Sequence, residues 1–136
     1  MRYAFTYVKD NGLGDSSVYP YEATDGACRH VPRSSDYFIS GYKASRGCDT
    51  LLNYMLEQPV SVALDGNPLQ NYKSGVLKCP TASINHAVLL VGTIKKHWII
   101  KNSWGANWGE NGFGRIHKTK NCGICLQYSV PLSNSE

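Results

Sequence analysis

Residues 84–92 read INHAVLLVG, and residues 98–105 read WIIKNSWG. Both are apolar runs of strand length with a polar residue near one end, His86 at the start of the first and Asn102 late in the second. A short turn between two such strands would make them neighbours and bring these side chains together. An imidazole that acts as a base needs one tautomer and one orientation, and an amide oxygen that accepts its second N–H supplies both. The sequence therefore predicts a His86–Asn102 hydrogen bond that Trp104 covers.

The histidine and the tryptophans also have plainer structural interpretations. A histidine taken alone is more often a core or strand-end residue than a catalyst, and the Asn102 and Trp104 context is what favours catalysis for His86. Trp98 lies inside an apolar strand and is predicted to be core. Trp104 and Trp108 each adjoin a glycine in turn-rich sequence, which favours a role at the site.

Composition indicates one globular domain. The chain has 136 residues, of which 42% are hydrophobic and 18% are charged, and a chain of this length can bury about two-thirds of its unfolded surface. The net charge of +4 is mild and only Lys95–Lys96 and residues 117–120 are clustered, which argues against nucleic-acid binding. No apolar run has the length of a membrane span, and the first residues lack a signal-peptide pattern. Five cysteines are typical of an oxidising compartment.

Hydrophobic periodicity predicts helices at the edges of an antiparallel sheet or barrel, an α+β class. Leu52, Met55 and Leu56 would form the buried face of one helix, and alternate residues of 60–64 would point inward from a strand. The predicted elements are a helix at 1–11, a loop at 12–31, a strand at 37–42, a helix from an Asp49 N-cap to Gln58, a strand at 60–64, a helical turn at 67–72, and strands at 84–91, 97–102, 113–117 and 126–130.

Five segments together resemble the successive signatures of the papain and cathepsin L family of cysteine peptidases. They are YPY at 19–21, QPVSV at 58–62, NHAV at 85–88, KNSWG at 101–105 and WGENG at 108–112. The resemblance runs almost end to end and implies an incomplete papain-like fold. Residues 1–40 would be one helix and the crossover loop of the helical L domain, residues 41–127 the β-rich, barrel-like R domain, and residues 128–136 a C-terminal tail.

The resemblance also implies roles for individual residues. His86 would be the general base and later the acid, Asn102 would orient it, Trp104 would shield the pair, and Trp108 would line the primed side of the cleft. The positions matching the pocket for the substrate's second residue are Met1, Ala63, Ile84, Ala87 and Gln127. Gln127 departs from the small or apolar residues frequent there, so we expect a more polar pocket floor. The substrate would be a peptide or protein, without a cofactor or metal.

The nucleophile has no counterpart among the five cysteines. The family's nucleophile lies in a Cys-Gly-Ser-Cys-Trp-like stretch that would fall about 45 to 65 residues before Met1, together with the oxyanion Gln. We therefore expect a fragment or truncated gene model whose partner is the missing N-terminal half, inactive alone. The alternatives are a non-catalytic homologue that binds peptides or a partner, and a secreted structural or storage protein. The resemblance implies a lysosomal, vacuolar or extracellular location.

The resemblance also bears on the cysteines. Cys79 and Cys122 match a disulfide of the family, and Cys28 matches one whose partner lies upstream. Cys48 and Cys125 depart from the pattern and could pair with each other. A zinc site on Cys122-x-x-Cys125 with a nearby histidine is the rival interpretation, but a lone Cys-x-x-Cys is weak support.

Overall fold

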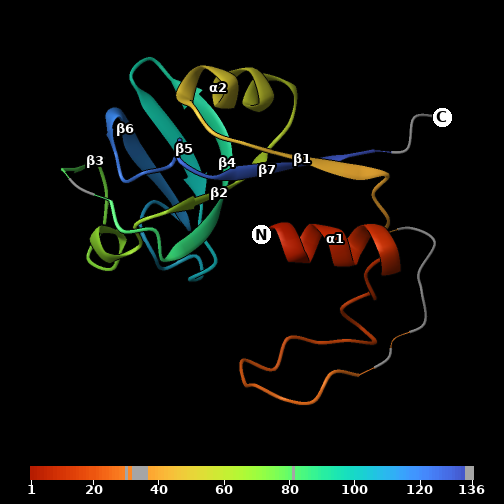
Figure 1. Cartoon of the computed structure of the whole chain (residues 1–136). Coiled ribbons are helices and arrows are strands. Elements are labelled where there is room, and N and C mark those ends of the chain that lie inside the picture. Colours follow the sequence, from red (N-terminus) through yellow and green to blue (C-terminus); the bar gives the residue numbers. More distant parts are fainter. Residues whose placement is uncertain (30, 32–36, 81, 134–136) are drawn as a thin grey trace. The chain divides into compact units, whose positions relative to one another are not determined.

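The computed structural model describes residues 1–29, 31, 37–80 and 82–133, and its fold is α+β. The described residues form two α-helices, one short 3-10 helix (η1) and a seven-stranded sheet (Figure 1). In chain order the elements are α1 Arg2–Asn11, β1 Gly41–Ser45, α2 Cys48–Glu57, β2 Val60–Leu64, η1 Asn67–Leu69, β3 Val76–Cys79, β4 His86–Ile94, β5 His97–Lys101, β6 Phe113–Asn121 and β7 Tyr128–Leu132.

The chain divides into two compact units. One consists of Met1 with Ala44–Val130, and the other of Arg2–Lys43 with Pro131–Glu136. The sequence-based domain boundary at 40/41 stays a prediction. No helix in the described part of the chain has the length and apolar character needed to cross a bilayer.

The sheet has the strand order β1-β7-β2-β4-β5-β6-β3. Strand β4 lies between β2 and β5 and is antiparallel to both, as the sequence predicted for these strands. Val60, Val62 and Leu64 of β2 are each 0% exposed, which confirms that they point inward, although Ala63 between them is also buried. Trp98 is 1% exposed and confirmed as core. The other largest fully buried side chains are Leu51, Leu69, Leu90, Ile100, Ile116, Ile124, Tyr128 and Val130.

The prediction of an antiparallel sheet or barrel is wrong for one strand, β3, which was not anticipated. β3 pairs with β6 in parallel, with Leu77 opposite Ile116, so the sheet is mixed. The strand has four residues, follows Gly75 and contains Lys78. A segment this short and this interrupted has no detectable period, and its place in the sheet depends on β6, which lies far along the chain.

Helix α2 begins for a different reason than the one predicted. Its N-cap is Gly47, with φ of 99° and no side-chain cap, so the prediction that Asp49 caps the helix is wrong. The Gly47 N–H donates to the Cys125 carbonyl (2.7 Å), and the Tyr128 hydroxyl donates to the Gly47 carbonyl (3.0 Å). These long-range bonds set the start of the helix, and the φ above zero there favours glycine.

The buried face of α2 is also shifted from the expected one. Leu51 is 0% exposed, Leu52 and Met55 are half-buried, and Leu56 is 70% exposed. The prediction that Leu56 lies on the buried face is therefore wrong. Each turn of an α-helix has 3.6 residues, so Leu51 lies about one turn after Gly47. With the start of α2 fixed at Gly47, the Leu51 side chain faces the sheet and the Leu56 side chain does not.

Two boundaries were misplaced. The strand expected at 37–42 is observed at Gly41–Ser45, and the strand expected at 126–130 is observed at Tyr128–Leu132 (β7), within the segment 128–136 that was described as a tail. Tyr128 and Val130 are each 0% exposed, so β7 is an interior strand. β7 includes Pro131, yet its residues Tyr128 and Val130 face the core.

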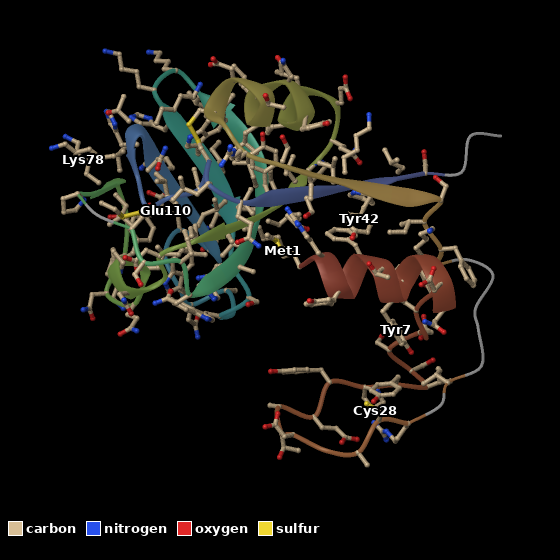
Figure 2. The ribbon with its side chains drawn as sticks, viewed as in Figure 1. Met1, Tyr7, Cys28, Tyr42, Lys78 and Glu110 are labelled. Atoms are coloured by element: carbon tan, nitrogen blue, oxygen red, sulfur yellow. A yellow bond between two sulfur atoms is a disulfide. The ribbon has the colours of Figure 1, made fainter. Side chains whose placement is uncertain are left out.

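The unit of Arg2–Lys43 with Pro131–Glu136 contains α1, which is confirmed. Phe5 of α1 stacks on Tyr42 (labelled in Figure 2) with ring centroids 5.6 Å apart, yet α1 has no fully buried residue. The loop predicted at 12–31 has neither helix nor strand in its described part. Asp15 begins a turn there by accepting the Ser17 N–H at 2.8 Å.

Both expected disulfides are present. Cys79 is bonded to Cys122 and Cys48 to Cys125, while Cys28 is free and exposed. The zinc alternative is wrong, because Cys122 and Cys125 belong to different disulfides. No cluster of potential ligands for a metal ion occurs among the described residues.

The Cys48–Cys125 disulfide joins residues 77 positions apart. We expect the double variant Cys48→Ala/Cys125→Ala to lose about 2–4 kcal/mol of unfolding free energy, because the unfolded chain regains entropy. Urea unfolding of the oxidised protein measures this loss. Cys28→Ser is the matched control and should change the free energy by less than about 0.5 kcal/mol. A double variant as stable as this control would contradict the expectation.

Candidate active site

His86 and Asn102 meet where two neighbouring strands end. His86 is the first residue of β4, Asn102 follows β5, and the register of these strands pairs Leu89 with Lys101. The His86 Nε2 and Asn102 Oδ1 atoms are 2.9 Å apart, which confirms the predicted contact. His86 also pairs with Leu64 of β2, so β4 has a neighbouring strand on each side.

The orientation of the Asn102 amide is determined by a second donor. The backbone N–H of Ser103 donates to the same Oδ1 at 2.8 Å, and an N–H can only donate to the amide oxygen. The oxygen therefore faces His86, which must donate from Nε2–H. This arrangement leaves the Nδ1 atom of a neutral imidazole as the proton acceptor. Asn102 is 8% exposed, so water competes weakly for the bond.

Trp104 covers the imidazole. Its ring stacks on His86 with centroids 4.8 Å apart and an interplanar angle of 29°. Trp108 meets Trp104 edge-on at 5.8 Å and is itself fixed, because its Nε1–H donates to the Leu69 carbonyl at 2.8 Å. Trp104 is 41% exposed and Trp108 is 8% exposed, so one ring is accessible from solvent and the other supports it.

The Trp108 loop rests on a network that sequence reasoning missed. Both carboxylate oxygens of Glu110 (labelled in Figure 2) accept from the Arg115 guanidinium, at 2.6–3.2 Å. Glu110 also accepts the Gly75 N–H at 2.9 Å, and the Tyr72 hydroxyl donates to the Gly75 carbonyl. The hydrogen bonds from Arg115 are the largest cause, and that from Gly75 the next, of the lowered pKa of Glu110. In the sequence analysis Glu110 appears only within the WGENG segment at 108–112, without a role of its own.

A buried carboxylate fixes the segment that leads into β4. Asp65, 6% exposed, accepts the N–H groups of Asn67 (3.0 Å) and Ser83 (3.1 Å). The Asn85 side-chain oxygen accepts the Gly66 N–H at 2.7 Å. Sequence reasoning also missed Asp65, although an acidic residue directly after the apolar strand VSVAL was an available signal.

The predicted substrate-pocket residues fall into two groups. Met1 and Ala87 line a cavity of about 360 Å³ whose other lining residues are Ser61, Val88, Leu89, Lys101, Asn102 and Ser103. Ala63 lies opposite Ala87 in the β2–β4 register, and its N–H donates to the Gln127 carbonyl. Ile84 packs against Gly123, where an added Cβ atom would lie 2.7 Å from the Ile84 side chain. The pocket roles of these five residues stay predictions.

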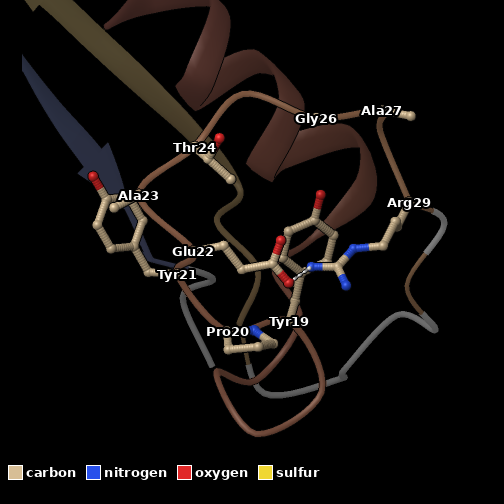
Figure 3. Close-up of a pocket in the computed structure, with 9 residues that line it drawn as sticks. All are labelled: Tyr19, Pro20, Tyr21, Glu22, Ala23, Thr24, Gly26, Ala27 and Arg29. Carbon is tan, nitrogen blue, oxygen red and sulfur yellow. Dashed lines mark hydrogen bonds and ion pairs between the residues drawn. The ribbon is translucent and has the colours of Figure 1, made fainter.

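A second hollow of about 290 Å³ lies within residues 19–29 (Figure 3). The Arg29 guanidinium lies over the Tyr19 ring, 4.5 Å from its centroid, and forms a 3.1 Å ion pair with Glu22 (Figure 3). Its lining contains neither a histidine nor a cysteine, and the hollow has no counterpart to the His86–Asn102 pair.

The family model described as papain family cysteine protease matches residues 1–132. The chain therefore belongs to the papain family. Cathepsin L 1 of Paramecium tetraurelia is 44% identical over 130 residues, covering 95% of this chain and 41% of that protein. Cathepsin L2 of Homo sapiens is 37% identical over 150 residues, covering 96% of this chain and 45% of that protein. The chain thus spans less than half the length of these curated relatives.

Solved structures agree with this assignment. A Carica candamarcensis cysteine protease in complex with E-64 matches with a TM-score of 0.87 and 32% identity, over 98% of this chain and 68% of that one. Digestive procathepsin L 3 of Tenebrio molitor matches with a TM-score of 0.87 and 37% identity, over 97% of this chain and 48% of that one. The fold is therefore a partial papain-like α+β fold.

The Asn102→Ala variant should release the imidazole from its single tautomer. In the wild type, 15N NMR at a pH where imidazole is neutral should show His86 protonated at Nε2. The variant should show a mixture of tautomers and lose about 1–3 kcal/mol of unfolding free energy, because the Ser103 N–H loses its acceptor. Asn53→Ala, at an exposed position of α2, is the control. A single, unchanged tautomer in Asn102→Ala would contradict the orienting role.

Glu110→Gln should destabilise the fold in a pH-dependent way. The pKa of Glu110 is lowered in the folded state, so its stabilisation is complete above its ordinary value of 4.5 and is lost as pH falls through the folded-state pKa. Urea unfolding at about pH 7 should show a less stable variant, and the difference should shrink toward about pH 3. Glu57→Gln, an exposed α2 residue, should show no such trend. A difference that grows on acidification would contradict the assignment.

Proposed function

We propose that this chain supplies the base side of a papain-like cysteine endopeptidase, which hydrolyses peptide bonds at a Cys-His-Asn site. The supporting observation is that Asn102 Oδ1 accepts from both His86 and Ser103, which leaves the His86 Nδ1 atom ready to take a proton. The nucleophilic thiol and the oxyanion donor would come from a segment outside these 136 residues.

The proposed reaction uses His86 twice. Its Nδ1 atom takes the proton of the cysteine thiol, and the thiolate attacks the carbonyl carbon of the scissile bond. The imidazolium then gives its proton to the leaving amine as the C–N bond breaks, which leaves an acyl thioester. His86 next removes a proton from water, the hydroxide attacks the thioester, and the proton returns to the departing thiolate. Asn102 holds the ring throughout and, being neutral, does not compete with the thiolate for the imidazolium charge.

The surroundings of His86 would shield the site and hold the substrate. Trp104 shields the His86–Asn102 bond from water, and Trp108 lines the primed side of the cleft. The pocket for the substrate's second residue is formed by Met1, Ala63, Ile84, Ala87 and Gln127, with a polar contribution from Gln127. The substrate is a peptide or protein chain, which fits the exposed Trp104 face.

The missing N-terminal half is the proposed partner. The cavity lined by Met1, Ala87, Val88 and Leu89 adjoins Asn102 and offers an apolar surface that this half would cover. The free, exposed Cys28 would pair with a cysteine of the same half. Two disulfides support maturation in an oxidising compartment, and we propose a lysosomal, vacuolar or extracellular location.

The test starts from the transcript. We expect the reading frame upstream of Met1 to encode a Cys-Gly-x-Cys-Trp-like stretch with a glutamine shortly before it. In the completed protein, His86→Ala should lower kcat/KM for a peptide substrate by about 10²–10⁴-fold, the usual contribution of general acid–base catalysis. Asn53→Ala should leave kcat/KM unchanged.

Two outcomes would overturn the proposal. An upstream frame without a cysteine in this context would identify a non-catalytic homologue that binds peptides or a partner. Full turnover in the His86→Ala protein, with a circular dichroism spectrum equal to that of the wild type, would show that another group acts as the base.

A further inference from the structure

Tyr72 lies at one end of a row of aromatic rings that leads to His86. Its ring contacts Trp108 with centroids 5.4 Å apart, at an interplanar angle of 40°. Trp108 meets Trp104 edge-on and Trp104 stacks on His86, so each ring of the row rests on the next. We call these four residues the aromatic row. Tyr72 is 6% exposed, so it lies beneath the surface that a substrate would touch.

The Tyr72 side chain is fixed at its hydroxyl group. This group donates to the Gly75 carbonyl at 2.6 Å and accepts the backbone N–H of Arg115 at 3.1 Å. Gly75 precedes β3 and Arg115 belongs to β6, so the hydroxyl connects these two strands where their pairing begins. Phenylalanine at this position would leave one backbone acceptor and one backbone donor without their partner.

Glu110 holds the same two residues by their other groups. Its carboxylate accepts the Gly75 N–H and the Arg115 guanidinium, while the Tyr72 hydroxyl bonds to the Gly75 carbonyl and the Arg115 backbone N–H. Gly75 and Arg115 are therefore each bonded to both side chains. Glu110 belongs to the turn that follows Trp108, so this network fixes the turn relative to the Tyr72 ring.

The Tyr72 and Trp108 rings fill space that two glycines leave open. A Cβ atom added at Gly114 would lie 2.9 Å from the Trp108 ring and 3.3 Å from the Tyr72 ring. A Cβ atom added at Gly109 would lie 3.1 Å from the Tyr72 ring. The Leu69 carbonyl accepts both the Trp108 Nε1–H at 2.8 Å and the Tyr72 backbone N–H at 3.1 Å. Because the two rings share one acceptor and one tightly packed space, displacement of either displaces the other.

The turn that carries Trp108 also reaches Asn102 through the backbone. The Gly112 N–H donates to the Trp108 carbonyl at 2.8 Å, and the Gly112 carbonyl accepts the Asn102 N–H at 3.0 Å. Asn102 is thus held at its backbone by this turn, while its side-chain oxygen contacts His86. Tyr72 is accordingly connected to both members of the pair, to His86 through the rings and to Asn102 through the turn.

We propose that Tyr72 is a positioning residue for the His86–Asn102 pair. It acts by fixing Trp108, and through it the ring over the imidazole and the turn against the Asn102 backbone. The catalytic meaning of this role rests on the proposed function, because an imidazole that acts as a base must be held close to its productive geometry. The alternative is that Tyr72 is one more core residue, whose loss lowers stability without a local effect at the site.

Tyr128 provides a matched control. It is 0% exposed, and its hydroxyl also donates to a glycine carbonyl, that of Gly47. Its ring packs edge-on against Tyr54, with centroids 6.3 Å apart, and is not part of the aromatic row. Tyr72→Phe and Tyr128→Phe therefore each remove a buried tyrosine hydroxyl of the same kind, but only the first hydroxyl belongs to the aromatic row.

The test compares amide hydrogen exchange, followed by NMR, in the oxidised 136-residue chain and these two variants. Two backbone N–H groups are measured, that of Asn102, which the turn holds, and that of Gly47, whose carbonyl bonds to Tyr128. A loss of global stability accelerates both and leaves their ratio unchanged. We expect the Asn102/Gly47 ratio of exchange rates to rise at least about tenfold in Tyr72→Phe, and to stay level or fall in Tyr128→Phe.

The imidazole gives a second readout in the same samples. Trp104 stacks on His86, so its ring current should shift the His86 ring protons upfield from the positions of an unstacked histidine. Tyr72→Phe should reverse part of this shift, because the row loses its fixed end. Tyr128→Phe should leave the shift unchanged.

A second pair of variants displaces the aromatic row without removing a hydroxyl. In Gly114→Ala the added methyl group would lie 2.9 Å from the Trp108 ring, whereas in Gly92→Ala it would lie 3.7 Å from its nearest neighbour, an ordinary contact. Gly114→Ala should change the His86 ring-proton shifts as Tyr72→Phe does, and Gly92→Ala should not. This pair decides the proposal if Tyr72→Phe does not fold.

Turnover completes the test. In the completed enzyme, Tyr72→Phe should lower kcat/KM at least about tenfold, and Tyr128→Phe less than about twofold. The positioning role is refuted by an unchanged Asn102/Gly47 ratio with unshifted His86 protons in Tyr72→Phe, or by equal losses of turnover in the two variants. Failure of the proposed function would appear separately, as full turnover in His86→Ala, and would leave the exchange and shift results standing.

Discussion

The structure of the candidate site depends on one carboxamide oxygen. Asn102 Oδ1 accepts N–H groups from His86 and Ser103, and the backbone donor removes the freedom of the amide to flip. The imidazole consequently has one tautomer and one direction. Each neighbouring feature maintains this bond: β2 and β5 flank the strand that carries His86, Trp104 covers its ring, and Trp108 supports Trp104.

Much of this arrangement could be predicted from local sequence. The strands that carry His86 and Asn102 are long apolar runs joined by a short turn, so their adjacency follows from hydrophobic periodicity alone. The inward alternation of β2 and the burial of Trp98 have the same origin. The disulfide pairings needed the family resemblance, because spacing by itself leaves the connectivity open.

The remaining features depend on partners that are distant along the chain. Helix α2 starts at Gly47 because Cys125 and Tyr128 bind its backbone, which no local capping rule reveals. Glu110 and Asp65 look like ordinary surface acids until Arg115 and the backbone N–H groups around them are in place. Sequence patterns therefore located His86, Asn102 and the bond between them, but not the long-range contacts of the surrounding residues.

The two outer strands of the sheet have a consequence for self-association. In the strand order, β1 and β3 are the edges, with unpaired backbone groups available to another chain. Strand β1 has five residues with Lys43 exposed, and β3 has four with Lys78 exposed. Adding a further strand would place these ammonium groups against a second copy of themselves. Short edge strands with an exposed lysine disfavour the edge-to-edge strand pairing that leads to fibrils.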